Sequence, residues 1–357
     1  MSRSAIPITD IARAFATRGE PIMVSPVGEG LINDSYLVKC PAGQYLLQRI
    51  NTRVFQNPAE VMQNIARVTG HLAEKARQRY PDDWQRRVLT LVPTCEDEPM
   101  WQDGHGNCWR MYPFIENSRT LQTLNDPGEA YSAAHAFGGF VRELADLPPP
   151  ALHETIPAFH DTPARLARLE AVINADPVKR RAGAEEVTEE ILSYRKLTAA
   201  LGDRQLPLRT VHNDTKINNI LFDASTGDAL CVVDLDTVMP GLALHDFGDL
   251  VRSAASVASG DGPRLDITLY EALLRGWVDG TGGILTRDER SMLWIAPQVI
   301  TLELAIRFLI DHLEGDRYFK TDHPTHNLER ATQQLSLLHS MQAQEGLMRS
   351  LCEAVSA

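Results

Sequence analysis

The chain of 357 residues carries a formal net charge of −12, and 43% of its residues are hydrophobic and 23% charged. This composition is that of an ordinary globular protein and excludes a fibrous or largely disordered chain. The negative charge argues against nucleic acid as the main partner, because such binding depends on Lys and Arg neutralising phosphates. With about 100–200 residues per domain, the length predicts two lobes or domains.

The sequence shows no sign of membrane insertion or of an oxidising compartment. It has no apolar run of the roughly 18–20 residues that a bilayer span needs, and its first residues lack the pattern of a signal peptide. We therefore expect a cytoplasmic protein without a membrane partner. Five widely spaced cysteines without a C-x-x-C pair predict free thiols: Cys40, Cys95, Cys108, Cys231 and Cys352.

The first elements along the chain are predicted to be strands. Residues 35–38 and 45–50 are β-prone and flank the turn-forming stretch CPAGQ, which predicts a β-hairpin, and residues 23–27 predict a strand before it. Asn57 followed by Pro58 is typical of a helix start, and apolar residues at helical spacing come after it.

A second pair of β segments is predicted after this helix. Residues 88–94 predict a strand, and residues 100–112 predict a hairpin whose turn lies at 103–106. The order of three strands, a helix, a further strand and a hairpin indicates an antiparallel sheet combined with one helix. We therefore expect an α+β N-terminal lobe over residues 1–113.

The remainder, residues 114–357, is predicted to form a mainly helical second lobe. Apolar residues recur three or four positions apart in six stretches: 131–147, 162–173, 184–201, 265–278, 289–313 and 328–351. The stretch LPPPALHETIP between the first two of these is expected to be a surface loop. The helical pattern is interrupted once, by a short β segment.

This β segment follows the polar stretch VHNDTKINN. Residues 220–222 and 230–233 flank the turn signals Ser-Thr-Gly-Asp and predict a hairpin. If the turn is centred between Thr226 and Gly227, antiparallel pairing places Asn219 directly opposite Asp234. Two oxygen-bearing side chains are then expected to meet at the open end of the hairpin.

Such a pair predicts a site for Mg²⁺, which takes a few oxygen ligands from a protein and keeps other positions for water or phosphate. Asn219 and Asp234 are the expected ligands. Asp214 lies five residues before Asn219 and is available to accept a hydroxyl proton. Lys216 is available to meet a phosphoryl group as a point charge.

These residues resemble the catalytic loop and metal-binding Asp of protein kinase-like phosphotransferases, and most closely those of the aminoglycoside phosphotransferase and choline kinase group. The pattern is His212-x-Asp214-x-Lys216-x-x-Asn219, with Asp234 following after one hairpin. The resemblance implies a bilobal protein kinase-like fold with ATP and Mg²⁺ as cofactors. It assigns Asp214, Lys216 and His212 to the catalytic loop, with His212 expected to hold the loop by hydrogen bonds.

The resemblance also implies a nucleotide site in the N-terminal lobe. Its glycine-rich loop is shortened, and Gln48 stands where the phosphate-binding lysine of kinases is expected, with Arg49 beside it. Which of these two contacts the phosphates is open at this point. The implied nucleotide contacts are Gly28, Gly30, Asn33, Gln48, Arg49 and the hinge residues Tyr112 and Phe114.

Several further segments are similar to those of N-acetylhexosamine 1-kinases, among them GEGLINDSYLV and IRFLIDHLEGDRYFK. The similarity implies phosphorylation of the C1 hydroxyl of GlcNAc or GalNAc, with the sugar as the small-molecule partner. The implied substrate contacts are Asp214, Asp236, Asp246, Phe247, Arg307, Asp311 and Tyr318.

Three alternatives remain open from the sequence. Another small-molecule kinase, for choline, homoserine or an aminoglycoside, would share the catalytic residues. A catalytically silent pseudokinase would be expected to lose Asp214, Asn219 or Asp234, and all three are present. A metal-dependent phosphatase would use Asp214 as a nucleophile but would not need a kinase-like N-terminal lobe. The sequence leaves the oligomeric state and the choice between GlcNAc and GalNAc undetermined.

Overall fold

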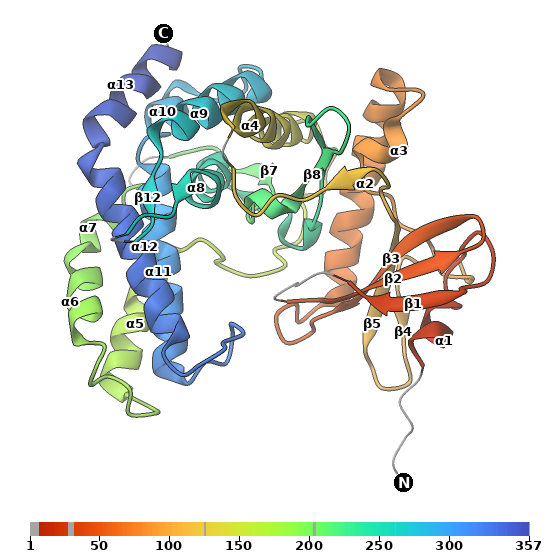
Figure 1. Ribbon diagram of the computed structural model, residues 1–357, viewed down its shortest axis with the longest axis horizontal. Coiled ribbons are helices and arrows are strands. Elements are labelled where there is room, and N and C mark those ends of the chain that lie inside the picture. The colour runs from red at the N-terminus through yellow and green to blue at the C-terminus, as the bar shows by residue number, and fades with distance from the viewer. Residues whose placement is uncertain (1–6, 28–31, 125, 203–204, 261, 357) are drawn as a thin grey trace.

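A computed structural model describes residues 7–356 except 28–31, 125, 203–204 and 261. Figure 1 shows a sheet-containing body built from the N-terminal part of the chain beside a larger, mainly helical body built from the rest. The predicted α+β class, with an antiparallel sheet in one part and a mainly helical remainder, is therefore confirmed. The division of the chain at residue 113 stays a prediction, although strand β5 ends there.

The N-terminal sheet has five antiparallel strands in the order β1-β2-β3-β5-β4. The predicted hairpin and its preceding strand are confirmed, whereas residues 88–94 make only isolated bridges, such as Val92 with Met111, and form no strand. The strands are β1 Met23–Pro26, β2 Asp34–Cys40, β3 Gly43–Ile50, β4 Trp101–Gln102 and β5 Cys108–Pro113.

Helices cover both faces of this sheet. Helix α1, Ile8–Ala12, packs with Leu47 on one face, and helix α2, Pro58–Arg79, packs with Leu46 on the other. Because side chains alternate along a strand, Gln48 shares the α2 face with Leu46, and Arg49 points the opposite way. This alternation decides whether the side chain of Gln48 or that of Arg49 points toward the second lobe.

The C-terminal body contains all six predicted helical stretches, although three of them are each divided into two helices. The helices after α2 are α3 Trp84–Arg87, α4 Pro127–Glu143, α5 Thr162–Ala175, α6 Glu185–Ser193, α7 Arg195–Thr198, α8 Ala243–Ala254, α9 Ile267–Thr281, α10 Arg287–Ser291, α11 Ala296–Glu314, α12 His326–Ala343 and α13 Glu345–Ser356. In the part of the chain that the structure describes, no helix combines the length and apolarity that a bilayer crossing needs.

Glycines allow helices α4 and α9 to pack closely. A Cβ added at Gly276 would lie 2.2 Å from the backbone oxygen of Tyr131, and one added at Gly138 would lie 2.8 Å from the backbone oxygen of Trp277. The two helices therefore meet backbone to backbone at these positions. They carry much of the large hydrophobic core on which the catalytic loop rests.

Strands β8, Ile220–Asp223, and β9, Ala229–Val232, form the predicted hairpin of the C-terminal body. Their register differs from the predicted one by one residue. Ile220 pairs with Val232, so Asn219 lies opposite Val233 and accepts a hydrogen bond of 2.9 Å from the Val233 N–H. Asp234 lies one residue beyond this pair, with a left-handed φ of 62°. The strands and short helices here are β6 Ser118–Arg119, β7 Arg209–Val211, η1 Ile217–Asn219, β8 Ile220–Asp223, β9 Ala229–Val232, η2 Leu235–Thr237, β10 Met239–Gly241, β11 Ser256–Val257 and β12 Arg264–Leu265.

Candidate active site

The loop from His212 to Lys216 is held from below by helix α8. Both carboxylate oxygens of Asp246 accept backbone hydrogen bonds, at 2.8 Å from the His212 N–H and at 2.7 Å from the Asn213 N–H. Asp246 is 0% exposed, and burial raises its pKa to about 7 against the effect of these two hydrogen bonds. The predicted sugar contact at Asp246 is therefore wrong, because a buried carboxylate whose oxygens are both bonded to the loop cannot receive a substrate.

Phe247 requires the same correction. Its side chain is 0% exposed and packs against Tyr270 and Trp277 within the large core. A residue in that position offers no surface to a ligand. Its contribution is to fix helix α8, and with it Asp246, beneath the catalytic loop.

His212 orders the loop by hydrogen bonds, as the sequence predicts. Its Nε2 lies 2.9 Å from the Val233 oxygen, and its Nδ1 accepts a hydrogen bond from the Asp214 N–H. Burial lowers its pKa, and this fits a neutral ring that donates through Nε2 and accepts through Nδ1. Because both ring nitrogens are bonded to the backbone, His212 positions Asp214 and takes no proton from a substrate.

Asp214 is at the centre of the polar stretch and remains accessible. Its side chain is 27% exposed, and its carboxylate lies 2.8 Å from Lys216 Nζ and 3.0 Å from Asn219 Nδ2. Burial would raise the pKa of Asp214, but the charge and hydrogen bond of Lys216 outweigh burial and leave the pKa below its ordinary value. Burial likewise fails to lower the pKa of Lys216, which the charges of Asp214 and Asp234 hold above its usual range.

Asp234 lies close enough to this group for the charges to interact, although it is not in register with Asn219. Burial raises the pKa of Asp234 to about 6, and the charge of Asp236 adds to that rise while Lys216 opposes it. A half-buried carboxylate beside a second one gains from a bound cation. The donor set of Asn219 and Asp234 fits Mg²⁺, which needs few protein ligands because phosphate oxygens and water supply the others. Within the described residues, no group of three or more His, Cys, Asp or Glu side chains forms a complete metal cage.

The predicted substrate contact at Asp236 is wrong, because this residue is 2% exposed and belongs to a buried network that the sequence does not reveal. Its carboxylate accepts a hydrogen bond of 2.7 Å from Asn33 and forms an ion pair with Arg110, whose side chain is 1% exposed. Arg110 also donates two hydrogen bonds to Gln48, from Nε at 3.1 Å and from Nη2 at 2.9 Å. The network thus connects strands β3 and β5 of the N-terminal lobe with the segment that follows Asp234.

This network changes the predicted roles at the nucleotide side. Gln48 faces the second lobe but is bonded to Arg110, whereas Arg49 pairs with Asp34 on the outer face of the sheet. The prediction that Arg49 contacts phosphates is therefore wrong, because strand alternation turns it away. Asn33 bonds to Asp236 and to the Asn51 N–H, and the predicted contacts Gly28 and Gly30 lie outside the described residues.

The predicted hinge residues differ in exposure. Tyr112 is buried and pairs with Leu46 of β3, while Phe114 is 38% exposed and its N–H donates a 2.9 Å hydrogen bond to the Gln44 oxygen. The side chain of Tyr112 therefore belongs to the lobe core. A nucleotide contact at Phe114 stays a prediction.

Helix α2 is joined to the C-terminal body by Asn64, which is 1% exposed. Its Nδ2 donates to the oxygens of His153, at 2.8 Å, and Val238, at 3.1 Å, while its Oδ1 accepts from the His153 N–H at 2.9 Å. A single amide thus satisfies three backbone groups across the two bodies, of which the Val238 oxygen is fully buried. The only hint in the sequence is a polar residue on the apolar side of a helix.

A buried His–Glu pair supports the catalytic loop from the side of helix α11. His160 lies 3.0 Å from Glu303 through Nδ1 and 3.1 Å from the Asn213 oxygen through Nε2. Burial would lower the pKa of His160, but Glu303 and the Asn213 oxygen raise it above its ordinary value, as expected for an imidazolium with two acceptors. The signal that the sequence analysis missed is a lone glutamate within the apolar run TLELAIRFL, because a buried charge requires a partner.

Of the predicted substrate contacts on α11 and the loop after it, Arg307 and Tyr318 keep accessible positions. The Arg307 guanidinium lies over three aromatic rings, at 5.1 Å from the centroid of Phe159, 5.7 Å from that of Tyr318 and 5.6 Å from that of Phe319. Tyr318 is 43% exposed. The charge of Arg307 also acts on His160, so this group lies near the catalytic loop.

Asp311 does not contact a substrate in this arrangement. It is 4% exposed, and its carboxylate accepts the N–H groups of Arg317, Tyr318 and Phe319. It also accepts a hydrogen bond from Asn327, and no ion pair with Arg307 forms. The prediction for Asp311 is wrong because the loop after α11 folds back over the end of the helix and uses this carboxylate to order itself.

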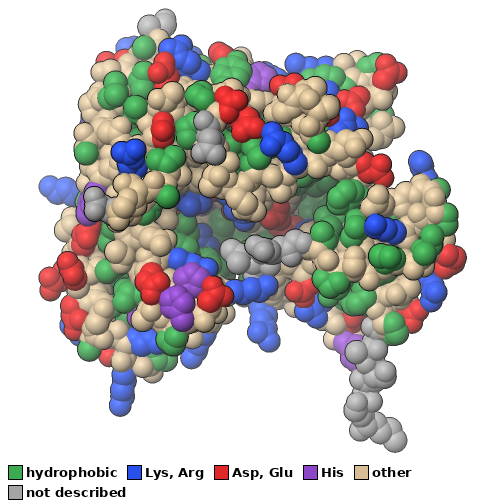
Figure 2. Space-filling view, viewed as in Figure 1, with side chains coloured by type: hydrophobic (Ala, Val, Ile, Leu, Met, Phe, Trp, Pro, Cys, Tyr) green, Lys and Arg blue, Asp and Glu red, His purple; other side chains and the backbone are tan. Residues whose placement is uncertain are grey.

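Figure 2 shows that the surface is hollowed between the two bodies, with acidic and basic side chains visible in its depth. The catalytic loop and the segment around Asp234 come from the C-terminal body, and the Arg110 network reaches them from the sheet. An accessible carboxylate, a paired lysine and a potential metal site thus lie together where two bodies meet. This is the arrangement that phosphoryl transfer needs.

Comparison with known proteins decides the family. Residues 24–283 match the model of the phosphotransferase enzyme family. This chain belongs to that family. The phosphotransferase is accordingly a member of the group that includes aminoglycoside phosphotransferase-like and choline kinase-like enzymes, and the sequence resemblance is confirmed at this level.

Solved structures support the fold of the phosphotransferase. An aminoglycoside phosphotransferase from Alicyclobacillus acidocaldarius has 16% identity and a TM-score of 0.64, with 99% of each chain covered. A choline/ethanolamine kinase family protein from Mesorhizobium loti has 21% identity and a TM-score of 0.58, with 98% of this chain and 99% of that one covered. Spectinomycin phosphotransferase in complex with ADP and spectinomycin has 11% identity and a TM-score of 0.63, with 97% and 99% covered.

Proposed function

We propose that this phosphotransferase uses ATP and Mg²⁺ to phosphorylate the anomeric C1 hydroxyl of an N-acetylhexosamine, GlcNAc or GalNAc, giving the sugar 1-phosphate. The family and the grouping of Asp214, Lys216, Asn219 and Asp234 support the phosphoryl transfer. The ADP in the related spectinomycin phosphotransferase supports ATP as the donor. The surroundings of Arg307 support the acceptor.

In the proposed reaction, the C1 hydroxyl donates a hydrogen bond to Asp214. The sugar oxygen forms its bond to the γ-phosphorus of ATP, the bond from that phosphorus to the bridging oxygen breaks, and ADP leaves. The hydroxyl proton passes to Asp214. The pKa of Asp214 is lowered, so the group is ionised at neutral pH and orients the hydroxyl more than it attracts its proton. This suits an anomeric hydroxyl, which is more acidic than other sugar hydroxyls.

Charge at the transferring phosphoryl group is offset by this chain's own cation. Lys216 is bonded to Asp214 and therefore lies where a hydroxyl on Asp214 would approach a phosphate. When bound, Mg²⁺ supplies charge neutralisation to the phosphate oxygens. Asn219 and Asp234 are the residues proposed to hold it, and Asn219 in addition keeps the Asp214 carboxylate in place.

The observation that carries the acceptor assignment is the Arg307 guanidinium, set among Phe159, Tyr318 and Phe319. A second cation, Arg165, is close enough that burial and the charge of Arg307 lower its pKa. Two guanidinium groups disfavour a cationic acceptor such as choline or an aminoglycoside. Aromatic faces and guanidinium donors instead suit a neutral sugar, whose hydroxyl and amide oxygens accept hydrogen bonds.

The deciding experiment is an ADP-release assay with ATP and Mg²⁺ over a panel of acceptors. We expect turnover of GlcNAc or GalNAc, with the phosphate placed on C1 by NMR, and little turnover of choline, homoserine or aminoglycosides. Turnover of a cationic acceptor without turnover of any hexosamine would reject the acceptor assignment. Absence of ADP release with every acceptor would reject the kinase activity itself.

The role of Arg307 has its own test. Arg307→Gln should raise the KM of the sugar while leaving the KM of ATP unchanged, because the group lies on the acceptor side. Arg317→Gln, from the loop that follows α11, is the matched control, since only its backbone N–H bonds to Asp311. A change in the KM of ATP in place of that of the sugar would place Arg307 at the nucleotide.

A further inference from the structure

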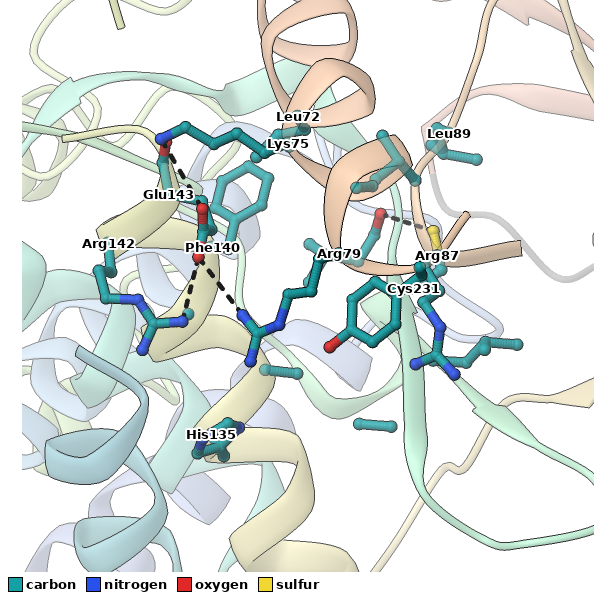
Figure 3. Close-up of a pocket in the computed structure, with 18 of the residues that line it drawn as sticks. Leu72, Lys75, Arg79, Arg87, Leu89, His135, Phe140, Arg142, Glu143 and Cys231 are labelled. Atoms are coloured by element: carbon teal, nitrogen blue, oxygen red, sulfur yellow. Dashed lines mark hydrogen bonds and ion pairs between the residues drawn. The ribbon is translucent and has the colours of Figure 1, made fainter. Parts of the chain in front are cut away.

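A cavity of about 220 Å³ lies between helix α2, helix α4 and strand β9. None of its lining residues is Asp214, Lys216, Asn219 or Asp234, so it is separate from the candidate active site. Figure 3 shows side chains from both helices pointing toward each other across it. The cavity therefore joins the helix of the N-terminal lobe to a central helix of the C-terminal body.

The charged side chains of the lining are mostly cations, in contrast to the chain as a whole. Lys75, Arg79, Arg87 and Arg142 line the cavity together with one carboxylate, Glu143. Lys75, Arg79 and Arg142 all reach this carboxylate, at 3.7, 3.7 and 3.1 Å. Lys75 also pairs with Asp146, and Arg87 pairs with Asp83 outside the cavity, so the four cations exceed these three carboxylates by one charge. This local excess is positive in a protein whose net charge is −12.

The positive charge also acts on a neighbouring ring. Burial lowers the pKa of His135, and the charges of Arg142 and Arg79 lower it further. A basic residue near the end of a helix favourably offsets the helix dipole, and this explains one cation on α2 and one on α4. It does not explain why cations from two helices converge on one cavity.

The remaining walls of the cavity are apolar. Leu72 and Leu89 come from the N-terminal part of the chain, and Phe140 and Leu230 from the C-terminal body. Tyr80 carries the Arg87 guanidinium over its ring at 4.2 Å. A ligand that fits must therefore combine a compact apolar group with a negative charge.

Gly139 supplies an independent indication that the cavity is kept open. A glycine inside a helix destabilises it relative to alanine, so it usually has a packing reason. Neighbouring Gly138 has one, because a Cβ there would lie 2.8 Å from the Trp277 oxygen. Gly139 lines the cavity, and a Cβ there would come within 4 Å of Arg142 Nη2 alone, at 3.9 Å.

We propose that this cavity binds a small amphiphilic anion, with a phosphate, sulfate or carboxylate group at the Lys75, Arg79 and Arg142 side and an apolar group against Leu72 and Phe140. An apolar cavity of about 150 Å³ is known to hold benzene. A space of about 220 Å³ thus accommodates one aromatic ring with one anionic group. The shared chemistry covers an aryl phosphate and an aryl carboxylate alike.

The test uses the full chain with saturating ADP and Mg²⁺, so that the proposed nucleotide site is filled. Phenyl phosphate and benzoate are the anionic probes, and benzyl alcohol and benzylamine are neutral and cationic ligands of similar size. Calorimetry should give one site for at least one anion with a dissociation constant below about 1 mM, and binding of the other two should be weaker by about tenfold or more. Equal binding of benzylamine would overturn the proposal, as would failure of both anions to bind.

Two variants locate the binding. Gly139→Leu fills the cavity and should weaken anion binding by about tenfold or more, whereas Gly70→Leu, on the exposed side of α2 with no atom within 4 Å of its added Cβ, should leave it unchanged. Arg79→Gln removes an exposed cation of the cavity and should weaken binding several-fold without depending on how Gly139→Leu folds. Undiminished binding in Gly139→Leu, or in Arg79→Gln, would place the anion elsewhere and overturn the proposal.

Discussion

The catalytic loop and the sheet that faces it differ in how their functional groups are arranged. In the loop, Asp214, Lys216 and Asn219 lie within six residues and contact one another directly. On the sheet side, Gln48 and Arg110 come from two strands and meet Asp236 from the other body. The loop concentrates its chemistry in one segment, whereas the network exists only because distant segments are brought together.

The comparison teaches that a cation can be brought beside a given strand position by a neighbouring strand. Gln48 stands where the lysine of kinases is expected, and the buried cation next to it comes from strand β5 as Arg110. Burial would lower the pKa of Arg110, but Asp236 keeps it charged. The cation is used to fix the segment after Asp234, so the two regions are mechanically connected.

The largest effect on activity is expected from a substitution in the catalytic loop. Asp214→Asn removes the proposed proton acceptor and should lower kcat by about 10²–10⁴, the range found for general base catalysis. Thermal unfolding should change little. Asp228→Asn, at the exposed turn of the adjacent hairpin, should retain full activity, and an active Asp214→Asn enzyme would contradict the proposed role.

The next largest effect, on stability, is expected from a substitution in the network of Gln48, Arg110 and Asp236. Arg110→Met leaves Asp236 buried without its cation and should lower the free energy of unfolding by about 3–5 kcal/mol. Urea denaturation measures the change. Arg49→Met is the matched control, because this arginine pairs with Asp34 at the surface and should contribute less than about 1 kcal/mol. Equal losses in the free energy of unfolding would show that the buried Arg110–Asp236 pair contributes no more to stability than the exposed Arg49–Asp34 pair.

A smaller effect is expected at the amide that joins helix α2 to the C-terminal body. Asn64→Ala leaves the buried Val238 oxygen and the partly buried backbone groups of His153 without their partner, and it should lower the free energy of unfolding by about 1–3 kcal/mol. At Asn57 the side chain makes no cap hydrogen bond, so Asn57→Ala should change stability by less than about 0.5 kcal/mol. A larger loss from Asn57→Ala than from Asn64→Ala would contradict the arrangement.

The smallest effect concerns the stability that the His160–Glu303 pair contributes beside the catalytic loop, and how this stability depends on pH. The pKa of His160 is raised above 6.5 in the folded protein, so the stability from its pairing with Glu303 is fully present below about pH 6.5 and is lost as the pH rises through the folded value. Burial would raise the pKa of Glu303, but His160 and nearby arginines lower it to about 2. The stability that the Glu303 carboxylate contributes is therefore lost only as the pH falls from 4.5 toward that value.

Melting temperatures of wild type and His160→Gln across pH 5–9 measure this effect. The difference between the two proteins should be largest near pH 5–6 and shrink toward pH 9. His339→Gln is the control, because this ring is exposed where it contacts Glu190 and should give a small difference at every pH. A His160→Gln difference that stays constant with pH would indicate a neutral ring in the folded protein.

Much of the fold could be predicted because its signals are local. Alternation and turn residues predicted the hairpin of β2 and β3, and helical periodicity predicted α2 from Pro58 onward. The predicted strand at 88–94 failed, because these residues bond to the sheet only at isolated positions. The hairpin register failed by one residue, because the turn is centred earlier than predicted, with Phe222 opposite Ala229, and the bulge between Leu221 and Phe222 removes only part of this offset.

The sequence by itself determined the residues of the catalytic loop, because Asp214, Lys216 and Asn219 are near neighbours whose spacing limits where they can lie. Only the tertiary structure decided that Asp246 and Asp311 are buried anchors, that Arg49 faces outward, and that His160 supports the loop. The sequence shows only that an Asp is present, and not whether its carboxylate contacts a substrate or buried N–H groups. Its role follows from the groups that folding places around it, and these come from distant parts of the chain.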